Sequence, residues 1–273
     1  MSRFLTLALT LSFSFAGCAD SPSDESAKRV SPVAATAKTA PVQAPVASAE
    51  LASDELVALV QSIEPQKARN GGLRFSDPAL DTPAAAPLLL ARLRSGSESE
   101  SVKEALALAL PRTRGDYAAG ALELLQTEKS SVMRAALIDA MRLSTDSDSA
   151  LQALAIGLSD SSADVRSRAA FNLGRRSDGL ALADELVHAL NDSDALVQSR
   201  TARALGQLGS KQGFDEVAAL LGSRDADVRL ESLRALGRMD AMRASEMAEL
   251  PTLANDADER IRNAAEKVMR RAY

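Results

Sequence analysis

The sequence is poor in the residues on which most metal and catalytic sites depend. Its 273 residues include one cysteine, one histidine and no tryptophan, and only 3% are aromatic. One cysteine excludes an internal disulfide framework, and one histidine with one cysteine excludes a His/Cys metal cluster. The scarcity of aromatic side chains argues against an aromatic ligand cage. The net charge of −5 lacks the basic excess that non-specific nucleic-acid binding requires, so we expect no nucleic-acid partner.

Residues 1–17 have the pattern of a signal peptide. Arg3 supplies a positive charge, and an apolar run of 13 residues extends from Phe4 to Ala16. Such a run is too short to span a bilayer but has the length of a signal peptide. The motif Phe15-Ala16-Gly17-Cys18 that ends it resembles the lipobox of bacterial lipoproteins, with Phe15 where leucine is usual.

The resemblance implies cleavage before Cys18 and attachment of lipid to its sulfur. Three fatty chains would make a lasting membrane anchor. In lipoproteins of Gram-negative bacteria, an aspartate directly after the cysteine signals retention in the inner membrane, and this chain has Ala19 there. We therefore expect a lipid-anchored protein of the outer membrane that faces the periplasm. The alternative is cleavage after Ser14-Phe15-Ala16, which would leave a soluble periplasmic protein with a free thiol.

Two segments separate Cys18 from the rest of the chain. Residues 18–50 are rich in serine, proline and alanine and have no apolar periodicity, which predicts a disordered tether spanning about 30 Å. Residues 51–82 begin with the amphipathic pattern Leu51–Ile63, which predicts a helix that caps the end of the domain. The remainder, with two glycines and two prolines, is expected to be irregular.

A repeat of one helical pattern dominates residues 83–273. The six apolar residues that mark it are Val102, Val132, Val165, Val197, Val228 and Ile261. Subtracting neighbouring residue numbers gives steps of 30, 33, 32, 31 and 33 residues. A period near thirty without strand-like segments predicts helix pairs stacked in one array, because each pair buries its apolar stripe only against its neighbours.

The repeat also contains residues that predict where helices begin and where neighbouring helices pack closely. Three residues before each marker, five of six positions hold an N-cap residue, and Lys129 is the exception. These positions are Ser99, Lys129, Ser162, Asp194, Asp225 and Asp258. Small residues follow four positions after the marker and predict close helix packing. Gly174, Gly206 and Gly237, nine positions after, are expected to loosen the ends of their helices.

The full motif is Leu-x-Asp-x-Asp-x-x-Val-Arg-x-x-Ala-x-x-x-Leu-Gly, and Asp160–Gly174 and Ser223–Gly237 match it best. It resembles the HEAT-like repeats first named for phycobilisome lyases, within the HEAT/armadillo superfamily. In the first two units Lys103 and Met133 replace the arginine of the motif. The resemblance implies an all-α, right-handed α-solenoid of about six HEAT-like helix pairs.

Two rows of arginines are candidates for binding. The resemblance implies that the arginine after each marker joins an arginine–aspartate ladder between turns, and a row that grips a ligand is the alternative. The proposed ladder consists of Asp160, Arg166, Asp192, Arg229, Asp256 and Arg262. A second row lies opposite the apolar stripe, on the helices that line the concave face in this family. It consists of Arg168, Arg175, Arg200, Arg203, Arg234 and Arg238, with Lys267 and Arg271 added by the sixth unit.

The second row is either an ordinary solvated surface, interrupted by Glu231, or a docking site. Its guanidinium groups suit an acidic peptide, a phosphate-bearing lipid or a cell-wall carboxylate. His188 has no candidate partner for catalysis, and the paired acids lie in turns where helix capping explains them. We therefore expect a non-enzymatic scaffold or adaptor of the bacterial envelope, without cofactor or metal, that binds a protein partner. The alternatives are a binder of anionic lipid, phosphate or cell wall, and a helper protein similar to bilin lyases.

Overall fold

The computed structural model describes residues 53–69 and 71–270. The chain divides into two units, Met1–Val46 and Ala47–Tyr273, and every helix and strand of the described residues lies in the second. The expected signal peptide, Cys18 and the tether at residues 18–50 lie outside the described residues, as does Arg271.

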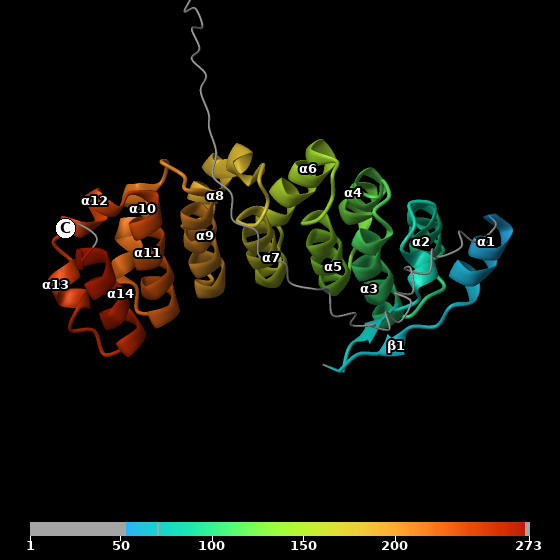
Figure 1. Cartoon of the computed structure of the whole chain (residues 1–273), viewed down its shortest axis with the longest axis horizontal. Coiled ribbons are helices and arrows are strands. Elements are labelled where there is room, and N and C mark those ends of the chain that lie inside the picture. The colour runs from blue at the N-terminus through green and yellow to red at the C-terminus, as the bar shows by residue number, and fades with distance from the viewer. Residues whose placement is uncertain (1–52, 70, 271–273) are drawn as a thin grey trace, which may run out of the picture. The chain divides into compact units, whose positions relative to one another are not determined.

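Six consecutive helix pairs make up the described part of the chain after residue 84 (Figure 1). The first helices of the pairs are α2 (Ala85–Arg94), α4 (Ala118–Thr127), α6 (Ser147–Leu158), α8 (Ala183–Ala189), α10 (Phe214–Ala219) and, together in the sixth pair, α12 (Ala241–Ser245) and α13 (Leu250–Leu253). The second helices are α3 (Glu100–Ala109), α5 (Ser131–Met141), α7 (Ala163–Leu173), α9 (Ala195–Leu208), α11 (Ala226–Met239) and α14 (Glu259–Met269). Short 3₁₀ helices accompany them at η2 (Leu110–Thr113), η3 (Gly179–Leu182) and η4 (Leu220–Gly222). This arrangement confirms the predicted all-α solenoid.

The segment before the first pair consists of a helix and a small hairpin. Helix α1 (Ser53–Ser62) buries Leu56 and Val60 and packs on α2. Strand β1 (Gln66–Lys67) pairs antiparallel with β2 (Leu73–Arg74), which lies against α3, and η1 (Pro78–Leu80) follows. The region expected to be irregular therefore contains a defined hairpin.

Two arginines from the helix pairs hold this segment in place. Arg92 of α2 donates to the Val60 and Ile63 carbonyl oxygens, both at 2.8 Å, and to the Glu98 carboxylate at 2.6 Å. Because these carbonyl oxygens lie at the C-terminal end of α1, they accept no hydrogen bond from the backbone of that helix. Arg112 of η2 donates to the carbonyl oxygen of Phe75 and, at 2.7 Å, to Asp81. The N-terminal segment is thus fixed by charge-assisted hydrogen bonds as well as by apolar packing.

Capping side chains begin most of the second helices. Those that accept a backbone N–H of their own first turn are Ser99, Ser130, Asp194, Asp225 and Asp258. The prediction was wrong for Ser162, whose side chain makes no capping hydrogen bond. Its backbone N–H donates to the Asp160 carboxylate at 2.8 Å.

The predicted register of the second repeat was wrong by one residue. Val132 is 45% exposed, whereas Met133 is buried, and the cap is Ser130 rather than Lys129. Met133 is therefore the apolar marker and does not replace the arginine of the motif, which is Arg134. With Met133 as marker the five steps become 31, 32, 32, 31 and 33 residues, a more even spacing.

The glycines of the repeat permit close contact between neighbouring second helices. A Cβ atom on Gly174 would lie 2.7 Å from the Ala204 Cα atom, and one on Gly206 would lie 2.5 Å from the Ala235 Cα atom. Such distances exclude a side chain, so the glycines are required by packing. Gly206 and Gly237 lie near the C-terminal ends of α9 and α11, and Gly174 is the C-cap residue of α7, so the loosening of helix ends stays a prediction.

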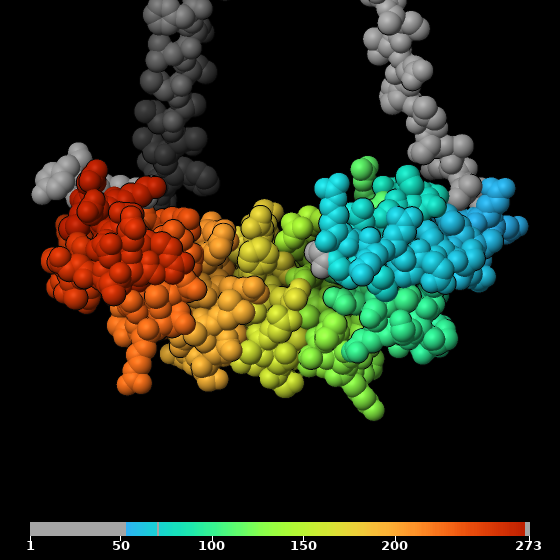
Figure 2. All heavy atoms as spheres, turned by 90° about the horizontal axis from the view of Figure 1, so that it is seen from below, coloured from blue at the N-terminus to red at the C-terminus, as the bar shows by residue number. Residues whose placement is uncertain are grey.

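The second helices form the inner side of the array. From α3 to α14, each packs extensively on the next, whereas the first helices contact one another less. The side with closer spacing must be the concave side of a curved row. Figure 2 shows the curvature of the second unit, with both ends lying to the same side of the middle.

Candidate interaction surface

An arginine–aspartate ladder runs along the turns at one edge of the array. Arg134 donates to both carboxylate oxygens of Asp160, at 2.6 and 2.8 Å. Arg166 contacts Asp192 in the same way, at 2.6 and 2.9 Å, and Arg229 contacts Asp256 at 2.9 and 3.0 Å. Each arginine thus pairs with the aspartate of the following repeat. Arg134 was missed by the sequence analysis because of the register error.

Each ladder member also satisfies backbone groups. The Nη1 atom of Arg166 donates to the carbonyl oxygens of Asp160 and Ser161, at 2.8 and 3.2 Å. Asp192 accepts the backbone N–H of Asp194 at 2.9 Å. The hydrogen bond from Arg166 lowers the pKa of the Asp192 carboxyl below its usual value, against the opposing effect of burial. With side chains of Arg166 and Asp192 only 16% and 10% exposed, this ladder is structural and leaves little for a ligand to contact.

The ladder is interrupted in the fourth repeat and ends in the sixth. Gln198 stands where the repeats on either side of it have arginine, and Ser223 stands where the next aspartate would be. Gln198 donates only to its own turn, at the Asp192 carbonyl oxygen. In the sixth repeat Arg262 likewise donates to the carbonyl oxygens of Asp256 and Ala257, with no carboxylate ahead of it among the described residues.

The six arginines of the second candidate row differ in how far they are already paired. Arg168 contacts the carboxylates of Asp139 and Asp164, so its charge is neutralised locally. Arg175 and Arg200 lie over the Phe171 ring, with guanidinium carbons 5.0 and 5.7 Å from its centroid. Both are thereby held beside an apolar surface that a ligand could also use.

The remaining three arginines lie on α9 and α11. Arg234 is paired with Glu231 at 2.7 Å. Within the described part of the chain, Arg203 and Arg238 form no ion pair or hydrogen bond, and neither does Lys267 of α14. We define the inner basic row as the cations on the concave side that are not neutralised by two acids. It consists of Arg175, Arg200, Arg203, Arg234, Arg238 and Lys267.

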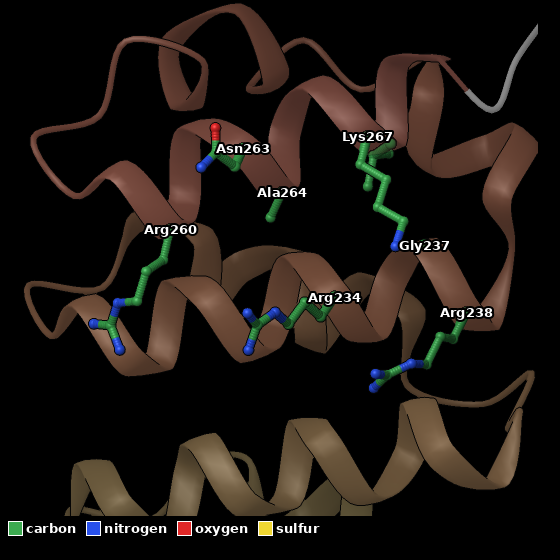
Figure 3. Close-up of a pocket in the computed structure, with 8 residues that line it drawn as sticks. Arg234, Gly237, Arg238, Arg260, Asn263, Ala264 and Lys267 are labelled. Carbon is green, nitrogen blue, oxygen red and sulfur yellow. The ribbon is translucent and has the colours of Figure 1, made fainter.

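A cavity of about 440 Å³ lies at the end of this row, between α11 and α14 (Figure 3). Its lining residues are Arg234, Gly237, Arg238, Arg260, Asn263, Ala264, Lys267 and Val268. Arg260 is held by Asp227 at 2.9 Å and by Asp258 at 2.7 Å. Its hydrogen bond lowers the pKa of Asp258 to about 2.

A second cavity, of about 390 Å³, lies near the other end of the array. Leu108 of α3, which is 45% exposed, borders it together with Phe75 and Arg112.

Arg176 and Tyr117 are buried polar residues that the sequence analysis missed. Arg176 donates to the Met141 and Ser144 carbonyl oxygens at 2.6 and 3.0 Å and to the Asp178 carboxylate. Tyr117 donates to the Ala140 carbonyl oxygen at 2.9 Å, and burial raises its pKa to about 12. Both satisfy carbonyl groups at the end of α5, so their role is structural.

The described residues contain no group of three or more potential metal ligands. His188 is exposed on α8. No helix between residues 53 and 270 is long and apolar enough to cross a membrane.

Comparison with known proteins agrees with this geometry. A family model of HEAT repeats matches residues 151–215 and 183–270. The fold is a HEAT/armadillo solenoid. Comparison with curated proteins gives no match. The phycobilisome-lyase type and the lipid anchor stay predictions.

Solved structures that are similar to this chain include engineered proteins. One engineered protein is 19% identical with a TM-score of 0.50, over 81% of this chain and 96% of that one. A second is 18% identical with a TM-score of 0.53, over 81% and 68%. Computationally designed armadillo repeat proteins for modular peptide recognition are 16% identical with a TM-score of 0.52, over 68% and 98%. At these identities the likeness shows the fold alone.

Proposed function

We propose that this solenoid is a non-enzymatic interaction scaffold that docks an acidic segment of a protein partner on its concave face. The observation that supports the proposal most is the inner basic row, which concentrates cations in a chain of net charge −5. Placing unpaired Arg203, Arg238 and Lys267 on one face stabilises a complementary anionic partner, since guanidinium and ammonium groups form strong hydrogen bonds with carboxylates.

The designed armadillo proteins with this fold were made for peptide recognition. Their likeness supports a peptide as the kind of ligand that such a surface accommodates. The solenoid needs no conformational change to present its concave face, because stacked pairs fix the second helices side by side.

The proposal includes a location in the bacterial envelope, at the periplasmic side of the outer membrane. Lipid on Cys18 would hold the protein there, and residues 19–50 would allow the solenoid to reach a partner away from the lipid surface. The lipobox-like motif supports this part of the proposal.

Crosslinking in cells tests the docking face. A photoreactive residue replaces Gln207, which is exposed on α9 beside Arg203, or His188, which is exposed on a first helix. We expect a discrete adduct from position 207 and none from position 188. The adduct should disappear when Arg200, Arg203 and Arg234 are all changed to glutamate.

A matched triple variant controls for the change in net charge. Lys129, Lys211 and Arg224 are exposed cations in turns outside the inner basic row. Their reversal to glutamate changes the net charge by the same amount and should leave the adduct unchanged. Equal loss in both triple variants, or an adduct that survives the reversal of the inner row, would contradict the proposed docking face.

A further inference from the structure

The cavity between α11 and α14 arises from a change in helix spacing. At the preceding junction, a Cβ atom on Gly206 would lie 2.5 Å from the Ala235 Cα atom, so the two backbones are in contact. At the last junction, a Cβ atom on Gly237 would first meet the Val268 Cγ2 atom, at 3.1 Å. Valine has replaced the alanine that permits backbone contact. Helix α14 is therefore held away from α11, and the space between them is the cavity.

The lining of this cavity carries positive charge without a balancing acid. Four of its side chains are cations, and no aspartate or glutamate borders it among the described residues. Arg234 and Arg260 have carboxylate partners outside the lining. Arg238 and Lys267 have none within the described ranges, and Lys267 extends from α14 toward Gly237 on α11 (Figure 3). Two free cations thus border the same space, one from each helix.

We infer that this α11–α14 cleft binds carboxylate side chains of an acidic peptide segment, with Arg238 and Lys267 donating to the carboxylates. The inference rests on the proposed function and specifies where along the concave face the acidic segment is held. Asn263 offers a neutral donor and acceptor at the rim, and Ala264 leaves room for a side chain to enter.

The arrangement of the inner basic row favours an extended peptide over other anions. Its cations recur on successive second helices, which pack about 9 Å apart. In an extended peptide of polyproline II conformation, with three residues per turn and about 3.1 Å per residue, every third side chain lies on the same side and recurs at nearly that spacing. A single lipid headgroup would use only one such position, and the net charge of −5 opposes nucleic acid.

Fluorescence anisotropy with a labelled peptide tests the inference on the purified full-length protein. The probe has twelve residues with glutamate at every third position and serine elsewhere, and a second probe has glutamine in place of glutamate. We expect the glutamate probe to bind in a salt-sensitive manner and the glutamine probe to bind at least about tenfold more weakly.

Two kinds of variant locate the binding. Arg238→Glu with Lys267→Glu removes both free cations, and Ala264→Leu fills the cleft without changing charge. Each should weaken binding of the glutamate probe by at least about tenfold. The matched control, Lys211→Glu with Arg224→Glu, should change it by no more than about twofold, since both cations lie outside the cleft. Circular dichroism and urea midpoints verify folding, and the double reversal involves exposed side chains only.

Other outcomes separate the cleft from the proposed function. If both cleft variants bind the probe normally while Arg200→Glu and Arg203→Glu together weaken it, the cleft is wrong and the docking face stands, because neither of these two arginines lines the cleft. If the wild-type protein does not bind the glutamate probe but binds phosphatidylglycerol vesicles or inorganic phosphate through Arg238 and Lys267, an acidic peptide is not the ligand of the cleft. An absence of any binding overturns the cleft as an anion site.

Discussion

Two buried hydroxyl groups show where single residues depart from the ideal repeat. Thr201 and Ser232 occupy the small position of the apolar stripe, where other repeats have Ala169 and Ala265. Both are 0% exposed, and their hydroxyl groups have no hydrogen-bond partner within the described part of the chain. An unsatisfied buried hydroxyl is unfavourable, because it loses its hydrogen bonds to water on folding.

Ser232→Ala should therefore raise the free energy of unfolding by about 1 kcal/mol, measured by urea denaturation. Ser199→Ala is the matched control, because that hydroxyl donates to the Leu196 carbonyl oxygen at 3.1 Å and its removal should bring no gain. A destabilised Ser232→Ala protein would mean that its hydroxyl has a partner after all.

Carboxylates of the ladder make stability depend on pH. Hydrogen bonds from Arg166 and Arg229 lower the pKa of Asp192 and of Asp256 in the folded chain. Groups with a lowered folded pKa stabilise the protein fully above their unfolded pKa, about 3.9 for aspartate. That contribution is lost as pH falls through the folded pKa. Protonation of these groups should therefore leave the urea midpoint unchanged near neutral pH. The midpoint should decrease when the pH is lowered below about 4. Asp192→Asn should be less stable at pH 7 and show a shallower decrease, and an equally steep decrease would contradict the assignment.

The register error at residues 132–134 shows that apolar periodicity alone does not determine which of two adjacent apolar residues is buried. Val132 and Met133 are both apolar, so periodicity alone does not choose between them. Two other signals in the sequence do: Ser130 is a better cap than Lys129, and Arg134 restores the arginine of the motif. The correct register thus needed capping and charge to be weighed together with hydrophobicity.

At the scale of elements, the helix pairs were predictable because their period, caps and apolar stripes agree. The hairpin of β1 and β2 was not, since two-residue strands carry no periodic signal. Its position depends on Arg112, which lies 37 residues from its acceptor Phe75. The candidate row was predictable as one face of successive helices, but the pairing of Arg168 with Asp139 required the corrected register of α5.

The arginine–aspartate pair that is absent between the fourth and fifth repeats provides a test of how strongly neighbouring repeats are coupled. Gln198→Arg together with Ser223→Asp would place the guanidinium and carboxylate where the other repeats have them. We expect the pair to raise the free energy of unfolding by about 1 kcal/mol more than the sum of the single changes, because both side chains would be largely buried and bidentate.

A double-mutant cycle by urea denaturation measures this coupling. The exposed pair Arg94–Glu123, whose side chains are 46% and 72% exposed, is the reference cycle and should give a coupling near zero. A coupling at the new rung no larger than this reference would mean that the ladder contributes alignment rather than stability.

At the scale of the molecule, the described part of the array has a covered first helix pair and a cleft between its last two second helices. The first helix pair is covered by α1 and by the hairpin against α3, so its outer apolar surface is shielded. Toward the other end, the substitution of Val268 for alanine separates the last two second helices and creates the α11–α14 cleft. The proposed binding cleft thus depends on a packing change at one residue, whereas the proposed location in the cell depends on the lipobox-like motif at Cys18.

Cys18→Ser should release the protein from membranes into the soluble fraction, because the serine hydroxyl does not accept the lipid that a lipobox cysteine receives. Detergent phase separation of cell lysates measures the release, with wild type expected in the detergent phase. Ala19→Ser is the control, since it leaves the sulfur in place and should keep the membrane association. If the Cys18→Ser protein still partitions with detergent, the lipid anchor is refuted. If it enters the aqueous phase while position 207 still crosslinks, docking on the concave face is independent of the anchor.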